Sequence, residues 1–363
     1  MAIVYLSPVS WNSIAQRPHF FADFLAKNSK TKVIWVDPLP SRFPKIDDIR
    51  TKLIGVEADS ISKMENIIVI RARNIIPVEP LNKFYKAINV YSLNKLIQNI
   101  KDEIGSQYCS LVVGKPSVFS LKLINAINFK YVIADVMDDY PQFFSGLAQI
   151  SVDKLLKDIL SKANIALFSS SGLINKYHSL AASSLLIKNA CSHDFLLNLQ
   201  ENNSDVDTQY LKKEITTYGY IGSIAKWFDW DFILRLSVEK PNSLIRIIGP
   251  NYSKLIDLPK NVVLEPAIHH SQIPKIVKSF DYGLIPFKIN ELTDSVDPVK
   301  YYEYTAAKIP VISTSFGEMA QRIDSGFAVT LDQHLNNKHP IIEPPVFWED
   351  RFKLIDREVL YAQ

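Results

Sequence analysis

Short apolar runs alternate with segments in which apolar residues recur every three or four positions, and this pattern fills the first half of the chain. The recurring segments predict amphipathic helices at 17–28 and 81–101. The runs predict strands at 2–7, 32–38, 65–73, 109–114, 131–137, 163–170 and 184–189. Strands that alternate with helices are typical of βαβ units and a parallel sheet.

A polar stretch at 199–214 interrupts this pattern and is the best candidate for a linker. The alternation then restarts, with strands predicted at 216–224, 243–250, 261–266, 282–287, 309–314 and 327–331. We therefore predict two doubly wound α/β domains, residues 1–205 and residues 206–345. The segment 346–363 follows a pair of prolines and is expected to be helical.

Composition narrows the class of protein. The chain has 363 residues, 47% of them hydrophobic and 22% charged, as in a globular domain pair. Two cysteines exclude a disulfide framework and a cysteine-rich zinc site, and the adjacent His269 and His270 have no spaced partners for a metal. No apolar run is long enough to span a membrane, and the N-terminal run is expected to be a strand. A net charge of +3 without a concentrated basic face argues against nucleic acid.

In open parallel sheets, ligands bind in the crevice beyond the carboxyl ends of the strands, so the loops after the predicted strands are the candidate site. Gly219 and Gly222 are expected at a strand-to-helix turn, where glycine lets the backbone approach a phosphate at a helix N-terminus. Gly249 ends the strand 243–250 in a similar way. Each glycine taken alone is equally typical of an ordinary turn.

The stretch "DPVKYYEYTAAKIPVIST" (297–314) offers a more specific arrangement. Pro298 suits the first turn of a helix, whose leading amides would be free for an anion. Lys300 adds a positive charge, and Glu303 lies one turn later, where it can accept hydrogen bonds from two hydroxyls. A diphosphate joined to a ribose needs this combination. The alternative is a Lys–Glu pair on the helix surface, which would stabilise the helix by roughly a few tenths of a kcal/mol.

The second half resembles the nucleotide-sugar-binding domain of GT-B-fold glycosyltransferases. The resemblance rests on four segments in a familiar order: 218–231, 245–250, 261–287 and 295–314. In the first half, "SWNSIAQRPHFFADFLAK" (10–27) and "YVIADVMDDYPQFF" (131–144) resemble a bacterial subgroup that builds surface polysaccharides of the O-antigen or capsule type, including glycosyltransferases assigned to teichuronic acid. The resemblance implies two Rossmann-like domains that face a central cleft, with a C-terminal helix that crosses back to the first domain.

By this resemblance, Glu303 would hold the ribose and Lys300 the diphosphate of the donor. Backbone groups of Ala267 and Ile268 would contact the base, and Lys226 would be a second cation. The other donor-binding positions that it implies are Gly222, Ser223, Gly249, Pro250, Ser295, Val296, Pro298 and Val299.

Two positions depart from the family pattern. Val296 stands where many retaining members carry a second glutamate, which favours inversion. Lys308 stands where relatives have glycine, and a non-glycine residue lowers stability if the helix end is left-handed.

The first half is expected to bind the acceptor. Asp138 and Asp139 follow a strand, and either is a candidate base for an inverting reaction, because crowded carboxylates raise each other's pKa. The alternative is that they cap the next helix.

Arg17 and His19 at a helix start are candidate contacts for an acceptor phosphate, and the alternative is that Arg17 packs against a neighbouring loop. Helix 81–101 is basic and amphipathic. Such a helix can lie on an anionic membrane surface, and the alternative is an ordinary half-buried helix with a solvated face.

The sequence thus predicts a cytoplasmic glycosyltransferase, with the cytoplasmic face of the membrane as an alternative location. It would move a sugar from a nucleotide-diphosphate sugar, with uridine as the favoured base, to a glycan or a polyprenyl-linked glycan. No metal, further cofactor or nucleic acid is expected. Two rival hypotheses remain: an epimerase of the same fold that acts on nucleotide sugars, and a catalytically silent protein that binds sugar nucleotides or serves as a scaffold.

Overall fold

The computed structural model describes residues 1–29, 31–40, 66–79, 82–201, 215–253 and 256–355. They form two compact units: residues 189–348 make up the second, and the other described residues make up the first. The expected domain boundary at 205/206 lies outside the described residues. Asn189 begins the second unit, which therefore includes helix α8 (His193–Glu201).

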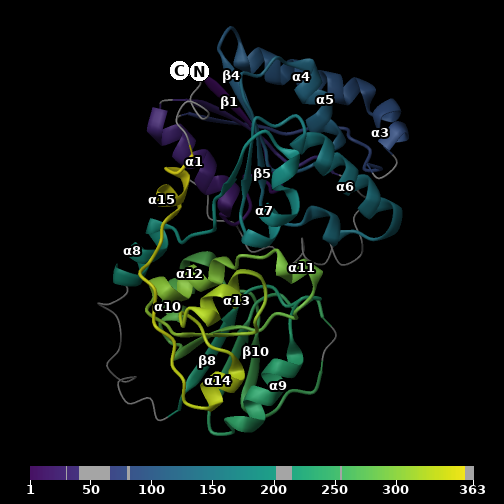
Figure 1. Cartoon of the computed structure of the whole chain (residues 1–363). Helices are drawn as coiled ribbons and strands as arrows, with labels where there is room; N and C mark the ends of the chain where they lie inside the picture. Colours follow the sequence, from purple (N-terminus) through teal and green to yellow (C-terminus); the bar gives the residue numbers. More distant parts are fainter. Residues whose placement is uncertain (30, 41–65, 80–81, 202–214, 254–255, 356–363) are drawn as a thin grey trace. The chain divides into compact units, whose positions relative to one another are not determined.

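Seven strands of the described chain form the parallel sheet of the first unit, in the order β3-β2-β1-β4-β5-β6-β7. They are β1 (Ala2–Leu6), β2 (Lys32–Val36), β3 (Ile67–Ile70), β4 (Cys109–Val113), β5 (Val132–Val136), β6 (Ile165–Phe168) and β7 (Ser184–Leu186). The helices that flank the sheet in Figure 1 are α1 (Arg17–Ser29), α3 (Asn82–Ile88), α4 (Val90–Ile104), α5 (Val118–Ala126), α6 (Gly146–Leu160) and α7 (Ser171–Tyr177), with short 3-10 turns at Tyr140–Phe143 and His178–Leu180.

The second unit repeats this plan on five strands of the described chain, in the order β10-β9-β8-β11-β12. They are β8 (Thr217–Ile221), β9 (Leu244–Ile248), β10 (Val262–Glu265), β11 (Tyr282–Ile285) and β12 (Val311–Ser313). Its further helices are α9 (Trp230–Glu239), α10 (Ile273–Val277), α11 (Glu291–Asp294), α12 (Val299–Ala306), α13 (Gly317–Asp324), α14 (Leu331–Leu335) and the start of α15 (Trp348–Phe352), with a 3-10 turn at His270–Gln272.

Burial explains why the strands are nearly continuous apolar runs. Every residue of β1, β4, β5 and β8 is buried, because helices cover both faces of a parallel sheet. The chain reverses the direction of strand order between β1 and β4 in the first unit and between β8 and β11 in the second. Loops that follow the strands at such a reversal form the crevice where α/β folds bind ligands, so each unit has one such edge.

Three sequence expectations need correction. The strand predicted at 327–331 is absent from the described residues: Val329 makes only an isolated bridge to Ile312. Thr330 and Gln333 form a capping box that starts α14 at Leu331, so the helix begins where the strand would have continued.

The helix predicted at 81–101 is divided into α3 and α4 at Asn89. The Asn89 side chain accepts a hydrogen bond from the Ile76 amide at 2.8 Å and donates one to the Ile76 carbonyl at 3.0 Å. This exchange with an outside loop takes Asn89 out of the regular helix. Leu93 and Leu96 are buried, as in an ordinary core-facing helix, whereas other apolar side chains of this region stay exposed.

The glycines of "GYIGS" also differ from expectation, because no helix follows them directly. Gly219 lies inside β8, and a Cβ there would lie 2.2 Å from the ring of Phe280, so this glycine serves packing. An eight-residue loop separates β8 from α9, which Asp229 caps through the amides of Asp231 and Phe232.

The C-terminal segment belongs to both units. Trp348 closes the second unit, and residues 349–355 are part of the first. The ring of Phe352 stacks on Phe21 of α1, with ring centroids 4.6 Å apart. The helix expected at 346–363 is shorter among the described residues: only Trp348–Phe352 is helical, and residues 353–355 form a turn. Residues 356–363 lie outside the described residues.

Candidate functional site

Two glycines bring the loops after β8 and β9 into close contact. Gly222 and Gly249 have φ angles of 147° and 146°, which side chains other than glycine rarely adopt. A Cβ on Gly249 would lie 2.2 Å from the carbonyl oxygen of Gly222. The amide of Gly222 donates to the Ile248 carbonyl at 2.8 Å, and the amide of Ile224 donates to the Pro250 carbonyl at 2.9 Å. The two strand ends therefore form one continuous backbone surface.

Lys300, in the first turn of α12, lies directly across this surface. A Cβ on Gly222 would lie 2.3 Å from Cε and 2.6 Å from Nζ of Lys300, so the lysine occupies the space that glycine leaves. Its ammonium lies 5.6 Å from the centroid of the Tyr220 ring, whose hydroxyl donates to the Ser223 carbonyl. Burial lowers the pKa of Lys300, although the nearby Glu303 carboxylate opposes that shift.

Glu303 follows one turn later and is half-buried. Burial raises its pKa to about 7, and the positive charge of Lys300 opposes the shift. Within the described part of the chain, neither side chain has an ion-pair partner within 4.0 Å, and the Glu303 carboxylate has no hydrogen-bond donor. Lys300 and Glu303 are partly desolvated and do not pair with each other. The ammonium and the carboxylate can therefore both form hydrogen bonds with a ligand.

Asp297, just before α12, fixes the start of this helix. Its buried carboxylate accepts hydrogen bonds from the Asn189 amide (2.7 Å), the Tyr302 hydroxyl (2.8 Å) and Arg322 (2.7 Å). Its carbonyl accepts one from the Asn189 side chain at 2.6 Å. Pro298 is the N-cap residue and makes no side-chain cap, and among the described residues the amides of Val299 and Lys300 have no acceptor. The N-terminal end of α12 is thus held in place with its amides unused.

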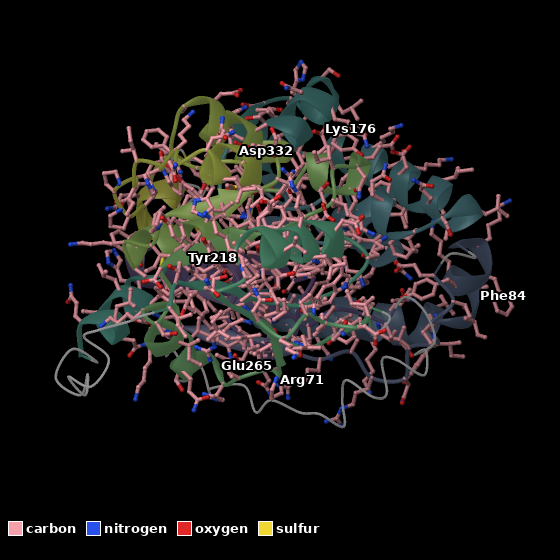
Figure 2. The ribbon with its side chains drawn as sticks, turned by 90° about the horizontal axis from the view of Figure 1, so that it is seen from below. Arg71, Phe84, Lys176, Tyr218, Glu265 and Asp332 are labelled. Atoms are coloured by element: carbon pink, nitrogen blue, oxygen red, sulfur yellow. The ribbon has the colours of Figure 1, made fainter. Side chains whose placement is uncertain are left out.

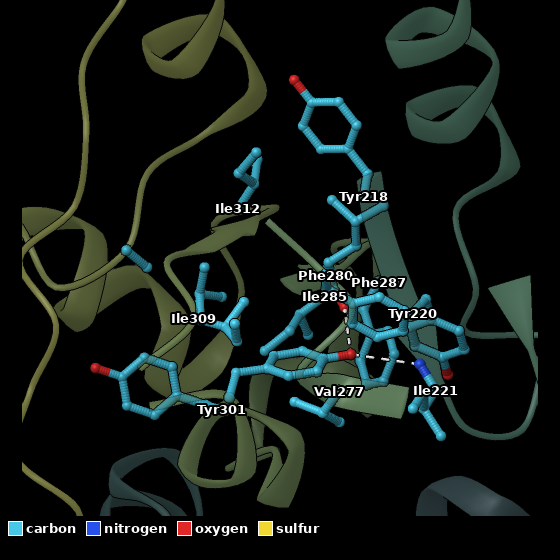
Figure 3. Close-up of a cluster of buried hydrophobic side chains, with 14 of the residues drawn as sticks. Tyr218, Tyr220, Ile221, Val277, Phe280, Ile285, Phe287, Tyr301, Ile309 and Ile312 are labelled. Atoms are coloured by element: carbon cyan, nitrogen blue, oxygen red, sulfur yellow. Dashed lines mark hydrogen bonds between the residues drawn. The ribbon is translucent and has the colours of Figure 1, made fainter. Parts of the chain in front are cut away.

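Tyr304 packs the opposite face of α12 against the sheet. Its ring lies where a Cβ on Gly283 would be, 2.4 Å from the nearest ring atom. Its hydroxyl accepts a hydrogen bond from the Ile221 amide at 3.3 Å, drawn as a dashed line in Figure 3. In the same figure Tyr220, Phe280 and other buried side chains surround this contact. The side chain of Lys300 therefore extends from a helix whose position on β8 and β11 is tightly fixed.

α12 ends in a left-handed residue, Lys308, with φ of 59°. The amide of Ile309 donates to the Tyr304 carbonyl, and the amide of Lys308 donates to the Thr305 carbonyl, which is the Schellman pattern. Lys308 therefore occupies a helix-end position that glycine favours, and α12 ends there without a glycine.

The other positions expected to bind the donor lie on the same strand-end loops of the second unit. Ala267 and Ile268 are half-buried after β10, with Ile268 packed against the core. Lys226 is exposed on the loop after β8. Ser295 is buried at the end of α11, and Val296 packs against the core while its carbonyl accepts a hydrogen bond from the Glu318 amide. Direct contacts join Gly222, Gly249 and Lys300, and the donor-binding roles of all these residues stay predictions.

In the first unit, Arg17 is engaged within the protein. Nε and Nη2 donate to one oxygen of Asp135 at 3.0 and 2.8 Å, and Nη1 donates to the Ile187 carbonyl. Asp135 also accepts a hydrogen bond from Tyr5 at 2.9 Å, and both charged side chains are almost fully buried. This is the alternative that the sequence left open for Arg17, and its contact with an acceptor stays a prediction.

His19 is also surrounded by protein groups. Nδ1 accepts a hydrogen bond from the Gln16 amide at 3.1 Å, so Nε2 carries the proton and faces the carbonyls of Ser10 and Trp11. Burial lowers its pKa, so the ring is neutral near pH 7. A neutral ring shapes the loop after β1 but supplies no charge to a phosphate.

The two candidate bases have different surroundings. Asp139 is buried, pairs with Lys176 at 2.6 Å and accepts a hydrogen bond from the Tyr177 hydroxyl at 2.8 Å. Asp138 is half-buried and has no ion-pair partner in the described chain. Burial raises its pKa to about 6, while Arg17 opposes the shift and the neighbouring aspartates add to it. A carboxylate with this pKa is suited to accept a proton near neutral pH.

Sequence reasoning missed three polar side chains near the loop after β5. Tyr140, Glu79 and Lys115 line one cavity, and the negative charges of Asp138 and Glu79 add to the burial that raises the pKa of Tyr140. Glu79 accepts a hydrogen bond from the Val118 amide at the start of α5. Lys115 follows β4 in "GKPS" (114–117). A search of the loops that follow predicted strands could therefore have found it.

No helix in the described chain is both long and apolar enough to cross a membrane. The described residues also contain no group of three or more His, Cys, Asp or Glu side chains placed to hold a metal ion.

Comparison with known proteins places this geometry in context. No protein-family model matches the chain. Over 339 residues it is 23% identical to the "Putative teichuronic acid biosynthesis glycosyltransferase TuaH" of Bacillus subtilis (strain 168), covering 86% of this chain and 80% of that protein. Sucrose-phosphate synthase from Thermosynechococcus elongatus matches with a TM-score of 0.62 and 12% identity, covering 91% of this chain and 85% of that one.

Anabaena Alr3699/HepE, solved in complex with UDP-glucose, matches with a TM-score of 0.59 and 10% identity, covering 99% of this chain and 90% of that one. These matches agree with the resemblance that the sequence carried and with the two doubly wound sheets. The chain has the GT-B fold, and the curated protein that it resembles in sequence is named as a glycosyltransferase.

Proposed function

We propose that the chain is a glycosyltransferase whose second unit binds the nucleotide-diphosphate part of a sugar donor. The observation that carries this proposal is the arrangement at α12: Lys300 lies across Gly222, the first amides of the helix are unused, and Glu303 is unpaired one turn later. Lys300 and the amides would hold the diphosphate, and Glu303 would accept hydrogen bonds from the ribose hydroxyls.

Uridine is the proposed base of the donor. Alr3699/HepE, which shares the fold and was solved with UDP-glucose, supports this choice. Lys300 and helix amides would neutralise the diphosphate, so donor binding in this proposal needs no metal ion. The backbone groups of Ala267 and Ile268, on the loop after β10, would contact the base.

Asp138 is the proposed general base for an inverting transfer. Its carboxylate would take the proton of the acceptor hydroxyl, whose oxygen forms the new bond to the anomeric carbon as the bond to the diphosphate breaks. The nucleoside diphosphate leaves with the bonding electron pair. Asp138 is favoured over Asp139, because Asp139 is already bound to Lys176 and Tyr177.

The proposed acceptor is a glycan or a polyprenyl-linked glycan in the synthesis of a cell-surface polysaccharide. The similarity to TuaH, whose name assigns it to teichuronic acid synthesis, supports this choice. Peripheral contact with the cytoplasmic face of the membrane belongs to the same proposal, because a lipid-linked acceptor would be held there.

Calorimetric titration with UDP tests the donor site. Glu303→Ala and Lys300→Ala should each weaken UDP binding by roughly tenfold to a hundredfold, as expected for lost charge-assisted hydrogen bonds. Glu239→Ala, on the exposed end of α9 in the same unit, is the matched control and should bind normally. Binding should also persist in EDTA.

Unchanged UDP affinity in Glu303→Ala would refute the donor-site assignment. Reaction products separate the rival functions: a transferase releases UDP only when an acceptor is present, an epimerase changes the donor without one, and a silent binding protein does neither.

A further inference from the structure

Exposed apolar side chains cluster on two segments of the first unit. On α3 and the first turn of α4, Phe84 and Tyr91 are 54% and 76% exposed, and Ile88 and Val90 between them are also exposed. Figure 2 shows Phe84 projecting outward from its helix. On the turn before α6 and in its first turns, Phe143, Leu147 and Ile150 are exposed. Scattered single apolar residues are normal on a surface, but seven on two short segments are not.

The two segments are neighbours in space. Glu79, three residues before α3, lines the same cavity as Phe144, Ser151 and Val152, which belong to the turn and to α6. On the adjoining α5, Lys122 is close enough to Lys86 of α3 that their repulsion adds to the burial that lowers the pKa of Lys122. The two segments that carry the exposed side chains therefore lie at one corner of the unit.

This corner is basic at one segment and uncharged at the other. On α3, which has no Asp or Glu, Lys83 and Lys86 are exposed, and Lys122 of α5 lies near Lys86. From Tyr140 to Val152 it has no charged residue. Any partner of this corner must accept apolar side chains and lysine ammonium groups together.

We propose that this surface, formed by Phe84, Ile88, Val90, Tyr91, Phe143, Leu147 and Ile150 with Lys83, Lys86 and Lys122, docks on an anionic phospholipid bilayer. Aromatic and aliphatic side chains enter the boundary between headgroups and acyl chains, while lysine stems extend their charges to the lipid phosphates. A protein partner fits less well, because lysine is depleted in protein–protein interfaces. Docking through this surface rests on the membrane contact proposed above, but vesicle binding requires neither donor nor transfer.

Vesicle flotation with the full chain is the direct test. The chain should float with vesicles of equal parts phosphatidylglycerol and phosphatidylcholine and stay behind with phosphatidylcholine alone. Phe84→Ser combined with Tyr91→Ser should reduce partitioning at least about tenfold, because two apolar anchors are lost. Tyr108→Ser is the matched control: Tyr108 is 78% exposed, lies outside this surface and should have no effect.

Lysine variants supply a second test. Lys83→Gln and Lys86→Gln should each weaken binding roughly fivefold. Raised salt should weaken binding of the parent chain more than that of a variant carrying both lysine substitutions. UDP titration of each variant verifies that the second unit is intact, so failure here is distinct from failure of the donor site.

No flotation at low salt would overturn the proposal and leave the surface as a site for a protein partner. Equal losses in the Tyr108 control, or full binding by both sets of variants, would also overturn it.

Discussion

Arg17 with Asp135 and Lys300 with Glu303 are two pairs of opposite charge beside strand ends of the two units, and they are built in opposite ways. Arg17 and Asp135 are almost fully buried, in direct contact, and further bound to Ile187 and Tyr5. Lys300 and Glu303 are half-buried and remain apart. A saturated pair holds a fold together, whereas an unsaturated pair keeps its hydrogen-bonding capacity for a ligand.

Breaking the saturated pair should have the largest effect. Arg17→Ala leaves the Asp135 charge buried without its partner and should lower the free energy of unfolding of the first unit by roughly 3–5 kcal/mol. Amide hydrogen exchange of β1 and β5 in urea would measure it. Lys300→Ala should leave the exchange of both strands unchanged, and a larger loss there than in Arg17→Ala would contradict the comparison.

The neighbouring aspartates repeat the comparison inside one loop. Asp138→Asn should lower kcat roughly 10²- to 10⁴-fold with little change in UDP affinity, because it removes the proton acceptor. Asp139→Asn should instead lower stability by about 1–3 kcal/mol, because the contacts with Lys176 and Tyr177 are weakened. Steady-state kinetics with thermal unfolding would separate the two effects, and full activity in Asp138→Asn would remove Asp138 from the reaction.

The pH dependence of UDP binding tests whether the Glu303 carboxylate accepts hydrogen bonds from the ribose. Its pKa in the free protein is about 7, so at lower pH the carboxyl is protonated and cannot accept both ribose hydrogen bonds. Affinity should rise about tenfold from one pH unit below that pKa to well above it. The same raised pKa makes stability fall as pH rises toward 7, because the folded chain then holds a proton that the unfolded chain has released.

Glu303→Gln is the control for both trends, since an amide does not titrate in this range. Calorimetry across pH should show a smaller slope in the variant, and an identical slope would assign the titration to the nucleotide or to another residue.

The smallest expected effect concerns the end of α12. Lys308→Gly should raise the free energy of unfolding of the second unit by about 1 kcal/mol, because lysine is strained at φ of 59° and glycine is not. Lys308→Ala should give no such gain. Thermal unfolding would measure both, and a loss in the glycine variant would show that the lysine side chain itself stabilises the helix end.

Elements could be predicted from the sequence where the residues of one continuous segment determine the structure. Buried parallel strands are near-continuous apolar runs, so almost all of them could be found without knowing their neighbours. The α12 segment was found in the same way, from Pro298, Lys300 and Glu303. The strand predicted at 327–331 failed because the local capping box at Thr330 competes with an apolar run of the same length.

Contacts between distant segments could not be predicted. Arg17 and Asp135 are 118 positions apart, and nothing near Arg17 shows that a buried carboxylate will meet it. Gly219 belongs to a pattern typical of phosphate loops, yet the Phe280 ring explains it. Val296 stands where many retaining GT-B enzymes carry a glutamate, but only the structure shows that its side chain packs against the core.

The contacts of Asp297 also have a consequence for how the second unit folds. Its carboxylate joins Tyr302, five positions away, to Arg322 and to Asn189, which is 108 positions away. Closing a loop of that length loses considerable chain entropy, and native contacts of such separation slow folding. We expect the start of α12 to reach its native geometry only after the segment at Asn189 has returned to it. The proposed donor site would then form late during synthesis, once Arg322 has emerged as well.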